Sequence, residues 1–458
     1  MSSVHAPAMA RQRSVRQSLE KTEVERWGPR LVAFTAAVWA ADGVLGLGIS
    51  VAILTATGFA TAVTGLWRPG LGILGVALLC TLDPLMNEYV FTGGLLRWNT
   101  FNYWLLLVIG LCPALLVRLQ SSQVVLFECW ALLLAFELLL SPDWLTGAQD
   151  LLGVIAALGL LIYFARAGAE GASWFWTAVL SGTVAVGGGF GYFFQTEKLQ
   201  VVNPNALAFL PITALVAGCM GLSFASERRG GQLVLAILCG LNFVLVFLTG
   251  SRGGMLTATA CATFMILGIR GLGRRTVIVS LIALTAVAAL SQFTELQTYA
   301  LARIHILFDP SVSLTDRTSG RADLALAGWH MFRDHPLGIG TGGFGITWSS
   351  LGISEGLSGW GLGKVKPAHA GWIKILVENG IPGILFFSMF LGSFLMVGWR
   401  NRHRGLLPLG LLATLVLGLG FLTTEYQSKG LWFIAAGVMI LLRRRTGRAQ
   451  LGRGASQR

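Results

Sequence analysis

Long apolar runs, separated by short polar segments, make up most of the chain. A helix needs about 20 apolar residues to cross a bilayer, and shorter runs are tolerated where the bilayer thins. Fourteen runs meet this criterion: 31–47, 49–66, 71–88, 101–118, 122–140, 149–167, 172–194, 204–223, 231–249, 254–270, 276–291, 382–399, 405–422 and 430–443. Residues 31–66 also allow a different division or a re-entrant segment. The pattern predicts an all-α, polytopic membrane helix bundle of about 12–14 transmembrane helices.

One long segment, residues 292–381, interrupts this pattern. It spans roughly 90 residues, and loops of this length in compact proteins are usually functional. Four of the six histidines lie in it: His305, His330, His335 and His369. We therefore expect any chemistry of this protein to take place in this loop, which is predicted to contain short helices.

The first predicted helix of the loop covers residues 321–335. The stretch Thr318-Ser319-Gly320 supplies an N-cap, Asp323 falls in the first turn, and Pro336 ends the run. The three- and four-residue spacing places Arg321 on one face with Leu324, Ala325, Gly328 and Phe332.

A second helix is predicted over residues 369–379, ended by Gly380 and Pro382 before the next span. Its spacing places His369 on a face with Trp372, Ile373 and Leu376. Lys374 and Glu378 fall on a different face, and we interpret them as a solvated ion pair.

The composition supports a membrane protein. Of the 458 residues, 12% are charged and 54% are hydrophobic, with a mean hydropathy of +0.69, whereas soluble domains carry about 25% charged residues. The 15 tryptophans and 59 glycines agree, since both residue types are enriched in spanning helices or at their ends. All six cysteines lie within or beside apolar runs and are interpreted as small buried hydrophobes: Cys80, Cys112, Cys129, Cys219, Cys239 and Cys261.

The net charge of +13 is explained by membrane topology. Most basic residues lie in short loops on one side, which the positive-inside rule assigns to the cytoplasm, so no nucleic-acid partner is implied. Both termini are then cytoplasmic, and the long loop is periplasmic or extracellular. The predicted division is a basic cytoplasmic tail (1–30), an N-terminal bundle (31–291), a periplasmic catalytic loop (292–381), C-terminal spans (382–443) and a second basic cytoplasmic tail (444–458).

Two glycine-rich stretches are candidate binding elements. "GIGTGGFG" (338–345) has the glycine spacing of a dinucleotide fingerprint, but no buried strand precedes it. We interpret it as a turn that lets the backbone pass close to the membrane or to a ligand. "LTGSRGGML" (248–256) predicts a tight turn between two spans, with exposed N–H groups suited to anions. Its single charge, Arg252, is either part of that site or a snorkelling arginine.

Polar residues inside or beside the spans have simpler explanations. Asn203-Pro204-Asn205 is interpreted as an ordinary helix start, with proline in the first turn. Charged side chains are costly against lipid, so the intramembrane acids are expected to face protein or water: Asp42, Glu128 and Glu137.

Three stretches, in this order, resemble the O-antigen ligase and O-antigen polymerase family: "GSRGG", "SGRADLALAGWHMFRDHPLGIGTGGFG" and "HAGWIKILVENGIPG". The resemblance covers residues from about 200 to about 400. In the ligase branch the last motif begins with a histidine and ends in two spaced glycines, which His369, Gly380 and Gly383 match. Ala370 stands where that branch has Asn, Ser or Gln, which keeps polymerases and protein-glycosylating relatives open.

The resemblance implies an inverting, metal-independent glycosyltransferase that works at the outer face of the bacterial inner membrane. Its implied donor is a glycan on undecaprenyl pyrophosphate, and its implied acceptor is another glycan, a lipid A-core sugar or a protein hydroxyl. Membrane lipids surround it, and no cofactor is implied.

The candidate site residues follow from the leaving group. Release of a pyrophosphate needs positive charge, and the sequence has no Asp-x-Asp motif and no carboxylate cluster in the loop at metal-ligand spacing. Arg252 and Arg321 are therefore predicted to grip the pyrophosphate, since guanidinium groups bind phosphate in a bidentate manner. His369 is predicted to accept the acceptor's proton, or else to hydrogen-bond the phosphate. Weaker candidates for substrate binding, equally explained as solvated charges, are Lys364, Lys366, Lys374 and Arg303.

Two other classes of function stay open at this point. A flippase or transporter of lipid-linked oligosaccharide or polysaccharide would also need many spans, although transporters are usually built from repeats. A membrane scaffold in a polysaccharide assembly complex is the structural alternative. The sequence does not separate ligase from polymerase, because both would use the same donor.

Overall fold

The computed structural model describes residues 5–65, 67–89, 122–167, 171–195, 204–224, 229–268, 272–290, 298, 301–302, 305–306, 308–318, 320–354, 368–400, 407–422 and 432–438. Every regular element in these ranges is helical. The helices are α1 (His5–Ala40), α2 (Asp42–Leu45), α3 (Leu47–Thr64), α4 (Pro69–Tyr89), α6 (Ser122–Glu137), η1 (Leu138–Leu140), α7 (Trp144–Ala167), α8 (Gly171–Gln195), α9 (Pro204–Phe224), α10 (Arg229–Leu248), α11 (Arg252–Gly268), α12 (Leu272–Leu290), α14 (Leu314–Arg317), α15 (Arg321–Asp334), α16 (Phe344–Ser354), α17 (Gly371–Arg400), α18 (Leu407–Leu417) and η3 (Gly418–Leu422).

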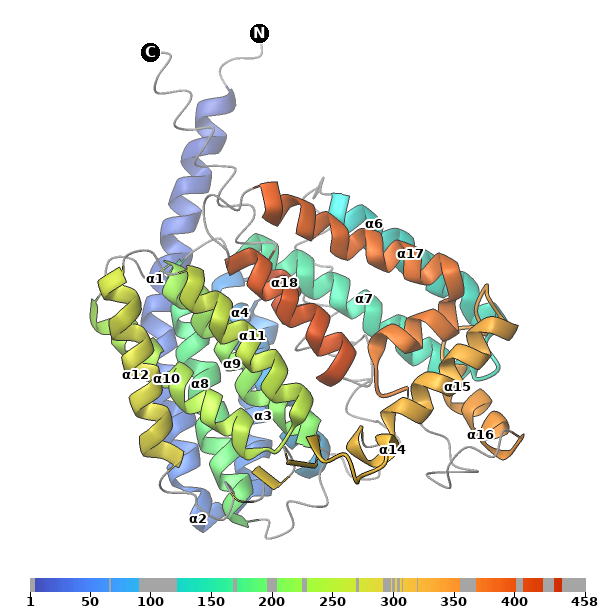
Figure 1. The fold of residues 1–458 in the computed structure, drawn as a ribbon. Helices are drawn as coiled ribbons and strands as arrows, with labels where there is room; N and C mark the ends of the chain where they lie inside the picture. Colours follow the sequence, from blue (N-terminus) through green and yellow to red (C-terminus); the bar gives the residue numbers. More distant parts are fainter. Residues whose placement is uncertain are drawn as a thin grey trace.

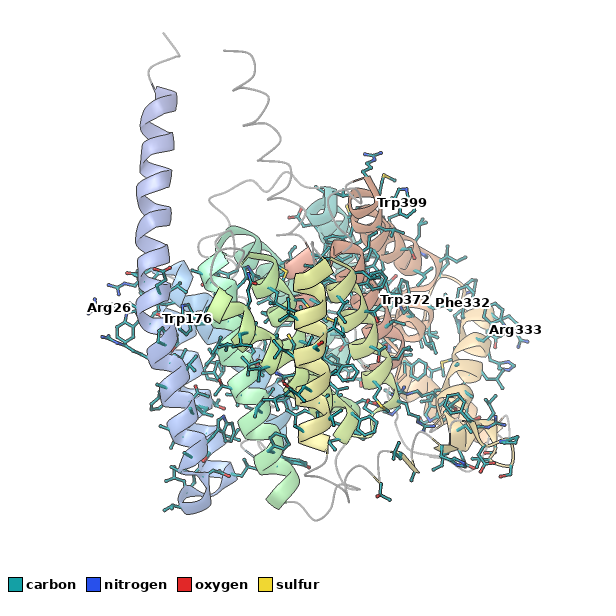
Figure 2. All side chains as sticks on the ribbon, turned by 60° about the vertical axis from the view of Figure 1, so that its left-hand side comes forward. Arg26, Trp176, Phe332, Arg333, Trp372 and Trp399 are labelled. Atoms are coloured by element: carbon teal, nitrogen blue, oxygen red, sulfur yellow. The ribbon has the colours of Figure 1, made fainter. Side chains whose placement is uncertain are left out.

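The helices form two groups, which Figure 1 shows side by side. In the larger group, α8 packs on α9 and on α1, α3 packs on α4, and α10 packs on α9 and α12. In the smaller group, α6 packs along α17 and against α7. Helix α18 lies between the groups and contacts both α11 and α17. Figure 2 shows the larger group from the side of α1, where Arg26 and Trp176 are labelled.

Several helices are suited to a membrane. Within the described part of the chain, five are long and apolar enough to cross one: Leu47–Thr64, Trp144–Leu161, Pro204–Leu222, Gly230–Leu248 and Gly371–Val397. Shorter apolar helices accompany them: Gly70–Met86, Val277–Ala288 and Leu409–Gly420. The predicted all-α, polytopic membrane bundle is therefore confirmed. The number of 12–14 spans stays a prediction, and candidate span 101–118 lies outside the described residues.

Polar groups within these helices follow the expectation only in part. Asp42 and Glu137 are buried in protein, as expected for intramembrane acids, whereas Glu128 lies exposed on α6. Four described cysteines are buried, as predicted, and Cys129 is half-buried: the buried ones are Cys80, Cys219, Cys239 and Cys261. Helix α9 begins at Pro204, which confirms the predicted helix start.

The long loop folds into a small helical unit, which we call the loop assembly: α14, α15, α16 and the part of α17 before Gly380. Its apolar core is separate from the main core and consists of Leu324, Ala327, Met331, Phe344, Trp348, Ala368 and Val377. The predicted helix 321–335 is confirmed as Arg321–Asp334. Its buried face differs slightly from the prediction, because Ala325 is exposed and Ala327 is buried instead.

Gly380 divides α17 in the way that the sequence predicted. Its backbone is non-helical, at φ 58° and ψ −153°, so a short helix ends there and a membrane-length helix follows. A side chain at Gly380 would collide with the backbone of Pro336 and Leu337. The break allows the chain after α15 to pass against α17, where the Ile381 N–H donates to the Pro336 carbonyl at 2.9 Å.

Candidate active site

Arg252 lies at the start of α11, directly after the tight turn that the sequence predicted. The Ser251 hydroxyl caps the helix by accepting from the Gly254 N–H at 2.9 Å, and it donates to the Asn205 side chain at 2.6 Å. One N–H predicted to face an anion is thus taken by the cap. The Arg252 guanidinium, half-buried, donates to the backbone carbonyl of Arg317. This hydrogen bond ties the membrane helix α11 to the loop assembly.

Arg321 is the first residue of α15, four positions after Arg317. Gly320 precedes it in a left-handed conformation, and the Thr318 hydroxyl accepts from the Ala322 N–H at 3.1 Å. The predicted N-cap region is therefore used, although the cap residue itself is Gly320. Arg321 is half-buried. Since Arg252 of α11 bonds to Arg317, the last residue of α14, its guanidinium lies beside the turn that leads into Arg321.

His369 lies two residues before α17 and not on its face, which corrects the prediction that it shares a helical face with Trp372. Its backbone has a φ of +53°, the one positive value for a non-glycine residue among those described. Such a conformation is uncommon without glycine and costs about 1–3 kcal/mol. The neighbours Ala368 and Ala370 are buried, so the half-exposed imidazole projects from a fixed stretch of backbone.

The three main candidates are linked through the loop assembly. Arg252 contacts the turn that leads into Arg321, and Ala368, beside His369, shares the small apolar core with Leu324 of α15. All three stand at helix starts: those of α11, α15 and α17. The weaker candidates Arg303, Lys364 and Lys366 lie outside the described residues.

Lys374 and Glu378 are buried, so the prediction of a solvated pair was wrong. The Lys374 ammonium lies 2.6 Å from the Asp150 carboxylate of α7 and 3.9 Å from that of Glu378, and the three side chains are at most 8% exposed. One cation thus lies between two acids, away from water. The same burial makes Lys374 unsuited to the substrate contact that the sequence suggested for it.

The glycine-rich stretch packs against the protein's own backbone. Residues 338–343, here called the glycine loop, contain Gly338, Gly340 and Gly342, each with a positive φ. A Cβ on Gly340 would lie 2.8 Å from the Ser141 backbone, and one on Gly342 would lie 2.5 Å from the Gly147 nitrogen. The prediction of close approach was right, but the backbone approached is that of Ser141, between α6 and α7, and of Gly147, in the first turns of α7, and not that of a ligand.

A protein carboxylate occupies the N–H groups of the glycine loop. The Glu378 side chain accepts from the Gly342 N–H at 2.9 Å and from the Phe344 N–H at 3.2 Å. The adjacent Asn379 donates to Glu137 of α6 and to the Thr341 hydroxyl. Because an internal carboxyl group already accepts from these N–H groups, we interpret the loop as a structural element.

We call this set of buried groups the polar network: Glu137, Asp150, Lys374, Glu378 and Asn379. Sequence reasoning missed it, although Glu137 and Asp150 within apolar runs gave a signal, since buried acids need partners. The partner could not be chosen from the sequence, because Lys374 lies more than 200 positions from either acid. Among the residues that the structure describes, no three His, Cys, Asp or Glu side chains gather as a metal site.

The fold and the site together define a class: a polytopic helical membrane protein with one arginine at the start of α11, and with an arginine and a histidine at helix starts of its longest loop. Residues 235–388 match a family model described as O-antigen ligase. This segment runs from α10 into α17 and contains Arg252, Arg321 and His369. The resemblance to the O-antigen ligase and polymerase family is thereby confirmed.

The match supports a glycosyltransferase of the O-antigen ligase or polymerase type in general terms. No curated protein matches the chain at a significant level. Helices α6 and α7, which supply Glu137 and Asp150 to the polar network, lie outside the matched segment.

Proposed function

We propose that this protein transfers a glycan from undecaprenyl pyrophosphate to an acceptor hydroxyl at the outer face of the bacterial inner membrane. The observation that carries the proposal is the hydrogen bond from Arg252 to the Arg317 carbonyl, which joins both arginines to one turn. Two permanently charged guanidinium groups beside that turn suit a leaving group with two phosphates.

The reaction is a single displacement. The acceptor oxygen attacks the anomeric carbon while the bond from that carbon to the pyrophosphate oxygen breaks, so the anomeric configuration inverts. The acceptor's proton passes to the imidazole of His369, and undecaprenyl pyrophosphate leaves with the bonding electrons. Arg252 and Arg321 stabilise the negative charge that develops on it, the task that a divalent metal performs in many other glycosyltransferases.

The placement of His369 supports its role as the base. The imidazole sits on a buried, conformationally strained backbone at the start of α17, and strained residues are typical of sites where a side chain must be held in one direction. The polar network fixes α17 and the glycine loop against α6 and α7. These contacts set the position of His369 relative to α15.

Complementation in the bacterial host tests the proposal. After deletion of the gene, we expect surface glycan to be lost and to return with the wild-type gene. Arg252→Ala, Arg321→Ala and His369→Ala are each expected to reduce transfer by about 100-fold or more. Arg252→Lys keeps the charge without the bidentate geometry and should retain part of the activity.

Arg68→Ala is the matched control, because Arg68 forms an exposed pair with Glu23 far from the loop. It should leave transfer unchanged at equal protein levels. Normal transfer by the three alanine variants of the site would overturn the proposal. Lipid-linked donor that crosses the bilayer without bond cleavage would instead establish a flippase.

The deletion strain also separates the finer functions. Accumulated lipid-linked polymer that is not attached identifies a ligase, and unpolymerised single repeat units identify a polymerase. Metal independence predicts that purified protein keeps its activity in excess chelator. Inversion predicts that the new glycosidic bond has the anomeric configuration opposite to that of the donor.

A further inference from the structure

Helix α15 is apolar on two opposite sides. One side is buried in the loop assembly through Leu324, Ala327 and Met331. The other side exposes Leu326 and Trp329, at 49% and 57%, although this helix lies outside the membrane-length helices of the fold. The Trp329 ring also contacts the Phe332 ring, with centroids 5.7 Å apart. A helix surrounded by water would carry polar residues on that second side.

The residues that follow α15 adjoin the exposed surface of a membrane-length helix. After Gly380, α17 exposes an apolar stripe, with residues at intervals of three, four or seven positions: Ile381, Leu385, Met389, Met396 and Trp399. Only about a third of the membrane-length part of α17 is buried, so this stripe faces lipid. Leu337, 72% exposed, adjoins the stripe, because the carbonyl of Pro336 accepts from the Ile381 N–H.

The residue types on this side of α15 are those of a bilayer interface. Tryptophan prefers the headgroup level, where its ring is partly buried and its N–H reaches water. Arg333 follows Trp329 by one turn and is also exposed, and its guanidinium pairs with the neighbouring exposed Asp334 at 3.1 Å. Figure 2 shows Phe332 and Arg333 at the outer edge of the molecule, while Trp399 lies near the far end of α17.

We propose that Leu326 and Trp329 of α15, together with Leu337 just after this helix, form a membrane-docking surface. This surface rests in the interfacial layer of the leaflet on its own side of the membrane. The occupant is the bilayer itself, because Leu337 adjoins the exposed apolar stripe of α17 at Ile381, and Leu326 and Trp329 are the residue types of a membrane interface. Docking would hold α15, and Arg321 at its start, at the depth of the phospholipid phosphates. Only the use of this position for catalysis rests on the proposed function.

Spin labels measure the depth of this surface directly. Single cysteines at positions 326, 329 and 337 are labelled in a full-length variant without other cysteines, in nanodiscs of phosphatidylethanolamine and phosphatidylglycerol. For each label, the rate of collision with oxygen, which is concentrated in lipid, is compared with the rate of collision with a nickel chelate, which stays in water. Position 385 on the α17 stripe is the lipid reference, and the exposed Ser311 position is the water reference.

The expected result is a ratio of oxygen to nickel collisions at 326, 329 and 337 that is several-fold above that at 311 and approaches that at 385. Ratios equal to the one at 311 would overturn the proposal. A photo-crosslinking residue at position 329, with all natural cysteines kept, gives a second readout. A phospholipid adduct supports the docking surface, whereas an adduct to glycan or to another protein contradicts it.

Discussion

The two sides of the loop assembly are held together in different ways. On the side of His369, buried groups far apart in the sequence meet: Asn379 donates to Glu137 across 242 positions, and Lys374 pairs with Asp150. On the other side, the hydrogen bonds within residues 309–318 join near neighbours, and the Arg317 carbonyl accepts one long-range hydrogen bond, from Arg252 of α11. The Ser311 N–H bonds to Asp309, and the Arg317 side chain bonds to the Val312 carbonyl.

The two kinds of contact differ in the free energy needed to open them. Breaking a buried network leaves charged groups without their partners, so the side of His369 opens only at high free-energy cost. Exposed local hydrogen bonds break at low cost, so the segment that leads to Arg321 is the easier one to open. We infer that a bulky lipid-linked donor enters past the arginines, toward a histidine that stays fixed.

The largest effect is expected from removal of the buried cation. Lys374→Met leaves Asp150 and Glu378 buried without their ammonium partner. Loss of one partner of a buried pair costs about 3–5 kcal/mol, so the free energy of unfolding should fall by this amount. Thermal unfolding in detergent is the measurement.

Two controls sharpen this prediction. Arg68→Met removes the exposed pair with Glu23 and should cost about 0–1 kcal/mol. The double variant Lys374→Met with Asp150→Asn also removes the carboxylate left without its ammonium partner, and it should recover part of the lost stability. Equal losses for Lys374→Met and Arg68→Met would show that the buried network does not hold the loop assembly.

The second effect concerns the glycine loop. Gly340→Ala places a Cβ 2.8 Å from the Ser141 backbone at a φ of +92°, so the loop must move away from the segment between α6 and α7. We expect a loss of about 1–3 kcal/mol from the backbone conformation alone, measured by thermal unfolding. Gly392→Ala is the matched control, since a Cβ there meets nothing within 4 Å and alanine favours the helix. A Gly340→Ala protein as stable as Gly392→Ala would contradict the role of the loop.

A smaller, local effect is expected at α14. The Ser313 hydroxyl caps this four-residue helix by accepting from the Asp316 N–H at 3.1 Å. Ser313→Ala should cost about 1 kcal/mol of local stability. Hydrogen exchange should then accelerate at residues 314–317 and stay unchanged at 372–379. An equal acceleration at both places would mean that the two sides of the loop assembly open together.

The smallest effect is a titration. Hydrogen bonds from the Ser311 hydroxyl, and then from its N–H, hold the pKa of Asp309 below its ordinary value of 3.8. Because the folded pKa is lowered, the ionised carboxylate stabilises the turn above the ordinary pKa, and this contribution is lost as pH falls through the folded pKa. In Ser311→Ala the pKa should rise toward the ordinary value, as measured by carboxyl NMR of aspartate-labelled protein. An unchanged pKa would exclude the hydroxyl as the main cause.

Local features of the fold were predictable from the sequence. The apolar runs predicted the membrane helices. The pyrrolidine ring of Pro204 predicted that α9 begins there, and Gly380 predicted the break in α17. The bounds of α15 differ from the prediction by one residue. Each of these depends on side-chain periodicity or on the backbone limits of one residue, both of which the sequence contains.

Long-range features were not predictable. The spacing of Lys374 and Glu378 is the same for a solvated pair and a buried one, and only the approach of Asp150 from α7 decides between them. His369 was placed on a helix because nothing in its neighbours indicates a left-handed backbone there. The glycine loop indicated close approach but not its partner. The roles of Arg252, Arg321 and His369 in chemistry stay predictions.

Transfer by purified protein tests the central claim most directly. The full chain is reconstituted in liposomes with an undecaprenyl-pyrophosphate-linked glycan, an acceptor glycan and excess chelator, and both products are followed. We predict equal amounts of elongated acceptor and free undecaprenyl pyrophosphate from the wild type, with rates for Arg321→Ala and His369→Ala lower by about 100-fold or more. Wild-type rates in both variants, or release of undecaprenyl pyrophosphate without glycan transfer, would contradict the account.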